Sequence, residues 1–131
     1  MLPQSRARQT KASFAVLTVL WFKRDLRLDD HEALQAAVAR GPVLPLYIVE
    51  PDLWRQGDLD LQHARFIEAS LSALDQDLRA RGAGLWVREG DAVAVLEDLR
   101  CKEGMTHLES HEETGNGWTY VRDRAVRAWC R

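Results

Sequence analysis

The stretch FAVLTVLWF, residues 14–22, decides the fold, because it is almost continuously apolar and rich in residues that favour strands. A strand with one solvated face alternates apolar and polar residues, whereas a continuous apolar run is typical of a strand buried on both faces. Such strands lie in the middle of parallel sheets. We therefore expect a buried parallel strand within one domain over residues 15–131, preceded by a flexible tail over residues 1–14.

Helix and strand patterns alternate along the rest of the chain. Asp29 and Glu32 resemble a capping box before a helix that ends at Gly41 and Pro42. The run Val43–Val49 predicts a second strand, in which Pro45 removes one backbone donor and favours a place near the strand's start or beside a less demanding neighbour. The remaining predicted elements are a long helix with Phe66, Ile67, Ser70, Leu71, Leu74 and Leu78 on one face, a strand at Leu85–Val87, a helix capped by Asp91 with Val95, Leu96 and Leu99, a strand from Met105 to Leu108, and a helix with Trp118, Val121, Ala125, Val126 and Trp129.

This alternation implies right-handed crossovers and a parallel sheet with helices on both faces. We predict an α/β fold, a three-layer, doubly wound, Rossmann-like sandwich. Ligands of such folds bind beyond the carboxyl ends of the strands, near the point where the strand order reverses. Candidate ligand residues are therefore those that follow Trp21, Val49, Val87 and Leu108.

Composition excludes several classes of function. Cys101 and Cys130 lie far apart and belong to no Cys/His ligand pattern, so we expect no metal site, no disulfide framework and a reduced, cytoplasmic protein. The formal net charge of −2 and the pI of about 6.1 provide no overall basic field, so any DNA substrate would be held by another part of the protein. No glycine-rich phosphate loop follows any predicted strand, which disfavours NAD binding and ATP hydrolysis.

The connection after the first strand interleaves three cations with three carboxylates. Its cations could bind an anion at a helix start, while its carboxylates could cap backbone amides or hold the arginines. The alternative is an internal network of ion pairs that only fixes the loop, and we favour this alternative. The residues concerned are Lys23, Arg24, Arg27, Asp25, Asp29 and Asp30.

Two further places at the expected ligand edge carry polar groups. Glu50 follows the second strand, where it could contact a ligand or stand as a solvated loop acid beside Pro51. The segment 109–120 mixes titratable, aromatic and glycine residues, and could form a chromophore pocket or a glycine turn into a helix that packs on the sheet. We expect no catalytic metal at His111 and no redox role for any of the five tryptophans.

The string WFKRDLRL, residues 21–28, followed by Asp30, His31 and Leu34, resembles the opening signature of DNA photolyases and cryptochromes. The resemblance continues through Pro45–Val49, the Arg65–Leu74 helix, Gly90-Asp91 and Thr106–Leu108, and so covers essentially everything from Val16 onward. In that family an N-terminal α/β domain holds an antenna chromophore. A larger helical domain binds FAD and performs light-driven repair of DNA or blue-light signalling.

The resemblance implies that this chain is the antenna domain of a photolyase-like flavoprotein, without repair activity on its own and without the last strand of the family's sheet. Its partner would be the C-terminal FAD-binding domain, and damaged DNA would be reached only through that domain. Trp118 and Thr119 stand where folate-antenna members carry an Asn-Glu pair, which favours a flavin, deazaflavin or lumazine over folate. A cryptochrome domain and an empty scaffold domain remain alternatives. The candidate antenna-binding residues are Phe22, Lys23, Arg24, Glu50, Glu109, His111, Glu112 and Gly115.

Overall fold

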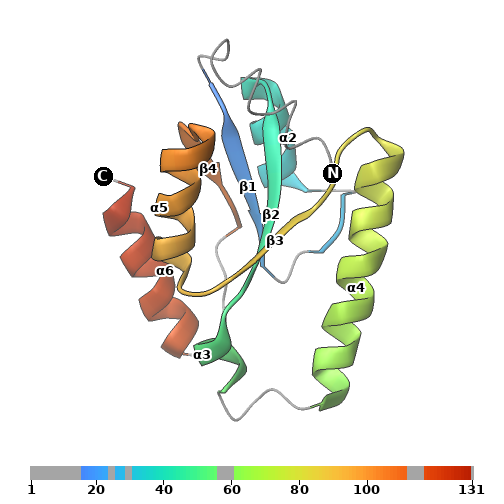
Figure 1. Ribbon diagram of the computed structural model, residues 1–131, viewed down its shortest axis with the longest axis vertical. Coiled ribbons are helices and arrows are strands. Elements are labelled where there is room, and N and C mark those ends of the chain that lie inside the picture. The colour runs from blue at the N-terminus through green and yellow to red at the C-terminus, as the bar shows by residue number, and fades with distance from the viewer. Residues whose placement is uncertain (1–15, 24–25, 29–30, 56–60, 112–116, 131) are drawn as a thin grey trace.

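The computed structural model describes residues 16–23, 26–28, 31–55, 61–111 and 117–130. The predicted tail lies outside these residues, and among the described helices none is long and apolar enough to cross a membrane. Figure 1 shows the order of the elements. They are β1 (Thr18–Phe22), α2 (Glu32–Arg40), β2 (Val43–Val49), α3 (Pro51–Trp54), α4 (Leu61–Ala80), β3 (Trp86–Glu89), α5 (Ala92–Glu103), β4 (His107–Glu109) and α6 (Gly117–Trp129).

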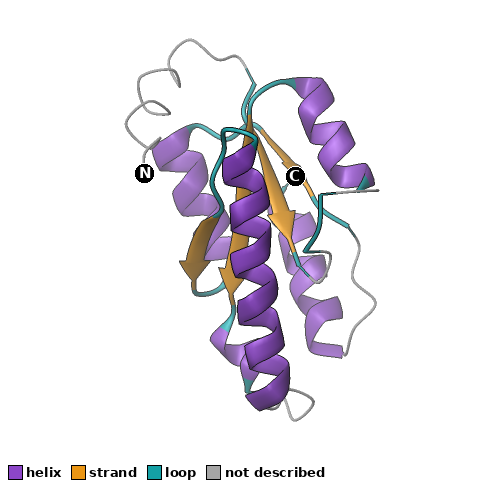
Figure 2. Cartoon of the chain, turned by 90° about the vertical axis from the view of Figure 1, so that its right-hand side faces the viewer, coloured by secondary structure: helices purple, strands orange, loops and turns teal. Residues whose placement is uncertain are grey.

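The described strands form a parallel sheet in the order β3-β2-β1-β4. The arrows in Figure 2 run in the same direction, as a doubly wound fold requires. Strand order reverses at β1, which has β2 on one side and β4 on the other. The predicted three-layer α/β architecture is therefore confirmed, and the crevice between the carboxyl ends of β1 and β4 is its topological switch point.

Side chains of β1 alternate between two apolar cores, although the strand is buried throughout. Val19 and Trp21 pack with residues of α5 and α6, while Leu20 and Phe22 pack with residues of α2 and α4. Figure 1 shows α5 and α6 on one side of the sheet and α4 on the other. The continuous apolar run of β1 thus reflects a strand covered on both faces.

The start of α2 differs from the prediction. We expected Asp29 to cap this helix, but the N-cap residue is His31, whose Nδ1 accepts a hydrogen bond from the backbone N–H of Leu34 at 3.0 Å. Asp29 lies outside the described residues. An imidazole nitrogen can take the place of the usual cap oxygen because it carries an unprotonated lone pair.

Helix α4 confirms the predicted long helix but not every member of its buried face. Leu74 and Leu78 are buried in the core that α4 shares with β1, whereas the Phe66 side chain is 70% exposed. The helix ends where Gly82 adopts a φ of 86° and the N–H of Ala83 donates to the carbonyl of Leu78. This left-handed residue makes the reversal into β3 possible.

Helix α6 lies at the predicted place with a different face toward the sheet. Val121 is 65% exposed, whereas Thr119, Arg122 and Val126 are buried. Arg122 and Asp123 of α6 meet the charged partners Glu50 and Lys23 at the carboxyl ends of the strands, and these ion pairs favour this side of the helix facing inward. Apolar spacing alone could not show this.

Candidate functional site

The candidate site lies at the carboxyl ends of β1, β2 and β4, where the N-terminal half of α6 contacts residues that follow the strands. Figure 1 shows α6 beside α5 on one side of the sheet. Lys23 follows β1, Glu50 follows β2, and Ser110 and His111 follow β4. Chain segments far apart in sequence therefore meet at the switch point, as the fold predicts.

An ion pair joins the end of β2 to α6. Nε of Arg122 lies 2.9 Å from one carboxylate oxygen of Glu50, and Nη2 lies 3.1 Å from the other. Both side chains are buried, with 6% and 5% of their surface exposed. These two hydrogen bonds fix the orientation of the guanidinium and carboxylate planes. Glu50 is therefore a buried ion-pair partner and not the solvated loop acid that we considered as an alternative.

A second ion pair lies beside the first. The Lys23 ammonium group donates to Asp123 Oδ1 at 3.2 Å and to the carbonyl oxygen of His111 at 3.0 Å. Arg122 Nη1 also donates to the same Asp123 oxygen. Asp123 thereby links the two cations, and Lys23 links the end of β1 to the loop after β4. The partner of Lys23 in this pair is a residue of α6, about a hundred residues away in sequence rather than within its own connection.

Trp21 forms the floor beneath these charges. Its ring is buried, with Lys23 Nζ at 4.5 Å and the Arg122 guanidinium carbon at 4.8 Å from the ring centroid. Trp118 lies farther from the same guanidinium, at 5.8 Å. Cations so close to an indole face gain electrostatic attraction from the ring quadrupole, so the aromatic floor and the charged groups position each other.

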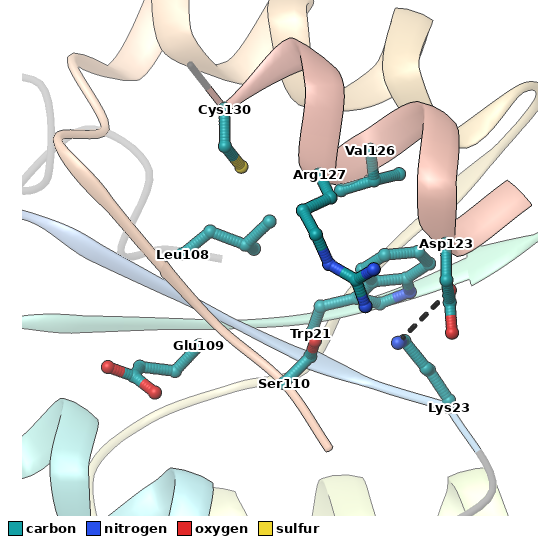
Figure 3. Close-up of a pocket in the computed structure, with 9 residues that line it drawn as sticks. All are labelled: Trp21, Lys23, Leu108, Glu109, Ser110, Asp123, Val126, Arg127 and Cys130. Carbon is teal, nitrogen blue, oxygen red and sulfur yellow. Dashed lines mark hydrogen bonds and ion pairs between the residues drawn. The ribbon is translucent and has the colours of Figure 1, made fainter. Parts of the chain in front are cut away.

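A cavity of about 270 Å³ opens beside this cluster. Figure 3 shows Lys23 and Asp123 pointing toward each other at one side of it. Lys23 is paired with Asp123, and Arg122 is paired with Glu50, so carboxylates lie beside both of these cations. The lining comes from β1, β4 and α6 and consists of Trp21, Lys23, Leu108, Glu109, Ser110, Asp123, Val126, Arg127 and Cys130.

The structure brings some of the predicted residues together and separates others. Lys23, Glu50 and His111 lie at the crevice. Phe22 is fully buried in the core on the α2 side. Glu109 is among the residues that line the cavity, and its carboxylate pairs with Arg40, whose Nη2 lies 3.0 Å away. Arg24, Glu112 and Gly115 lie outside the described residues.

Sequence reasoning missed Arg122 and Asp123. A signal was present, because Arg122 lies four residues after Trp118 and four before Val126, on the apolar stripe of a predicted helix. A charged residue on a stripe that faces the core requires a buried partner. That partner, Glu50, is 72 residues earlier in sequence, so the pair could not be assigned without the fold.

Comparison with known proteins decides the family. A family model described as DNA photolyase matches residues 18–131. The chain belongs to the DNA photolyase family. It is 40% identical over 87 residues, 66% of this chain and 18% of the relative, to a deoxyribodipyrimidine photo-lyase of Agrobacterium fabrum. It is also 35% identical over 92 residues, 70% of this chain and 14% of the relative, to Cryptochrome-1 of Arabidopsis thaliana.

A solved relative shares the fold of this photolyase-family chain. The archaeal photolyase from Sulfolobus tokodaii, solved with two FAD molecules and described as implicating a novel light-harvesting cofactor, superposes with a TM-score of 0.77 at 28% identity. The match covers 88% of this chain and 27% of the archaeal one. The chain thus spans about a quarter or less of these relatives and corresponds to the family's N-terminal α/β domain, as the resemblance implied.

Proposed function

We propose that this domain binds an antenna chromophore for a light-driven DNA photolyase, in the crevice between β1, β4 and α6. The observation that carries the proposal is the cavity at the topological switch point, with a buried indole floor and charged groups held by ion pairs. The photo-lyase relatives supply the reaction class. The isolated chain is inactive in repair, because the FAD chemistry belongs to a separate C-terminal domain that also contacts damaged DNA.

The chromophore is a flavin, deazaflavin or lumazine rather than a folate. A cavity of about 270 Å³ suits one fused ring system, and Trp21 offers an aromatic surface at its floor. The carboxylates of Glu50 and Asp123 lie beside the cations Arg122 and Lys23 and would repel a phosphate group. The aromatic ring of the chromophore, rather than a phosphate, therefore supplies the contacts here. The archaeal relative with two FAD molecules supports a flavin-type chromophore.

The cryptochrome relatives support a second candidate, the same domain in a blue-light photoreceptor. Repair of pyrimidine dimers by a full-length parent protein distinguishes the two. An empty scaffold domain is the third reading, and it predicts that no chromophore binds. Cys101 and Cys130 are exposed free thiols, which favour a reducing, cytoplasmic location for the protein under each of these three functions.

The test is a fluorescence and absorption titration of the chain with riboflavin, a deazaflavin, a ribityllumazine and methenyltetrahydrofolate. Ser110→Trp places a bulky side chain at the cavity wall without removing an ion-pair partner. Arg81→Trp adds the same side chain to an exposed position after α4, at the opposite edge of the sheet, and is the matched control. We expect saturable binding of a flavin-type ring that Ser110→Trp abolishes and Arg81→Trp leaves intact; no binding by any compound would leave the scaffold reading.

A further inference from the structure

The N-terminus of α2 is capped by two histidines from different segments of the chain. The backbone N–H of Leu34 donates to His31 Nδ1 at 3.0 Å, and the backbone N–H of Ala33 donates to His111 Nε2 at 3.3 Å. The first N–H groups of a helix have no partner inside the helix, so both bonds satisfy donors that would otherwise be left over. His111 thereby joins the loop after β4 to the start of α2.

The two imidazole rings also stack on each other. Their centroids are 4.4 Å apart with an angle of 17° between the planes, and the edge of Phe22 contacts His31 with centroids 5.3 Å apart. His31 is 1% exposed, whereas His111 is half-buried. The pair therefore packs as one unit against the end of β1.

Both caps require an unprotonated ring nitrogen. An imidazole nitrogen that bears a proton can only donate, so each accepting nitrogen must hold a free lone pair. A protonated ring here would lose its hydrogen bond to the helix and would place a positive charge at the positive end of the helix dipole. That charge would also lie against a second imidazole, which can itself take up a proton.

We propose that the stacked pair His31 and His111 is a proton-sensitive latch that holds His111, just after β4, against α2 when both rings are neutral, and releases His111 on acidification. Release would also move the His111 carbonyl oxygen away from the Lys23 ammonium group, 3.0 Å away, and so loosen the crevice between β1 and β4. The latch is a property of the fold and does not depend on which chromophore the domain binds.

Charged groups on each neighbouring element bear on the latch. The group after β1 is Lys23, the group on α2 is the exposed Glu32, and the group on β4 is Glu109, which already pairs with Arg40. Asp30 and Glu112, the chain neighbours of the two histidines, lie outside the described residues.

Nitrogen-15 spectra of the histidine rings in the full chain test the latch directly. At about pH 8, where imidazoles are ordinarily neutral, we expect His31 to carry its proton on Nε2 and His111 on Nδ1. This result needs no mutation. A proton on either accepting nitrogen in the folded chain at this pH would overturn the proposal.

Hydrogen exchange of the Ala33 and Leu34 amides gives the second readout. Between about pH 8 and about pH 5, their protection factors should fall by roughly three- to thirtyfold, the factor that corresponds to loss of a helix N-cap. In His31→Asn, whose side chain caps a helix without titrating, Leu34 should keep its protection at the lower pH while Ala33 still loses it. In His111→Gln the pattern should reverse.

His107→Gln serves as the control, because His107, on β4, contacts the preceding residue Thr106 and takes no part in the latch. It should leave the acid response of both amides unchanged. Protection that stays constant on acidification of the unmodified chain would overturn the latch, as would an acid response that persists in the double variant His31→Asn/His111→Gln.

Discussion

Arg122 meets both carboxylate oxygens of Glu50 across 72 residues of sequence, and the pair is buried at the carboxyl edge of the sheet. It ties α6 to the end of β2 and places Asp123, the next residue, against Lys23. The geometry of the crevice therefore depends on one salt bridge that no local pattern specifies.

Removal of the Arg122 guanidinium should be among the most damaging changes in the domain. Arg122→Met leaves Glu50 as a buried charge without this partner, and we expect the free energy of unfolding to fall by about 3–5 kcal/mol in urea denaturation. The double variant Glu50→Gln/Arg122→Met should lose less than the single variant, because no buried charge remains unpaired. Arg124→Ala, an exposed position two residues on, should change stability by less than about 0.5 kcal/mol. Equal losses in Arg122→Met and Arg124→Ala would contradict the role of the pair.

Helix α4 offers a contrast between a buried and an exposed apolar residue. Leu74 is 2% exposed and Phe66 is 70% exposed. Leu74→Ala should cost about 2–5 kcal/mol through lost burial and a cavity, whereas Phe66→Ala should lie within about 0.5 kcal/mol of the unmodified chain. Urea unfolding measures both, and a larger loss for Phe66→Ala would mean that α4 packs by another face.

The end of α4 depends on backbone conformation. Gly82 has a φ of 86°, a region that disfavours a side chain, so Gly82→Ala should destabilise the chain by about 1 kcal/mol. Gly84 lies two residues later, has no positive φ, and an added Cβ would meet nothing within 4 Å. Gly84→Ala should therefore be neutral or slightly stabilising. Thermal unfolding of the two variants side by side checks the difference, which would vanish if α4 did not end in this turn.

Glu97 should give the α5–α6 contact a dependence on acid pH. Hydrogen bonds from Arg100, then from the Trp129 indole and from Cys101, lower the pKa of Glu97 from 4.5 to about 2. Because the folded pKa is the lower one, this contribution to stability is complete above about pH 4.5 and is lost as the pH falls toward about 2. Unfolding free energies measured across that window should fall with pH.

Two variants separate this effect from the general response to acid. Glu97→Gln should flatten the part of the slope that arises at this site. Asp98→Asn removes a neighbouring carboxylate on the same helix, whose partner Lys102 lies at an exposed position, and should leave that part of the slope in place. A slope that is the same in the unmodified chain and in Glu97→Gln would refute the assignment.

The sequence pattern was sufficient to predict those strands and helix caps that depend only on residues nearby in the chain. The apolar run Val43–Val49 is the second strand, with Pro45 as its third residue, and Asp91 caps α5 by accepting from the backbone N–H of Ala94. These features depend on neighbouring residues, so the sequence alone was sufficient. The third and fourth strands lie one or two residues later than predicted, at Trp86–Glu89 and His107–Glu109, because short strands give few periods from which to set a boundary.

The remaining features depend on partners distant in sequence. The cap of α2 uses His31 together with His111, 78 residues after the Ala33 amide that it accepts from. The inward face of α6 follows from Glu50, Lys23 and Trp21 rather than from apolar spacing. The carboxyl edge of the sheet could be predicted as the candidate ligand edge because it follows from topology, whereas the side chains that meet there could not be paired before the fold was known.

Chemical-shift mapping with riboflavin tests the central claim most directly, that the crevice between β1, β4 and α6 holds a flavin-type chromophore. Backbone amide spectra of the labelled chain, recorded during a riboflavin titration, report where the ring binds. The account predicts saturable shifts at the cavity residues Lys23, Ser110, Asp123 and Arg127, with Gly41 and Gly104, which follow α2 and α5, unchanged. Shifts confined to residues outside the cavity, or no shifts at saturating riboflavin or with the other candidate chromophores, would contradict it.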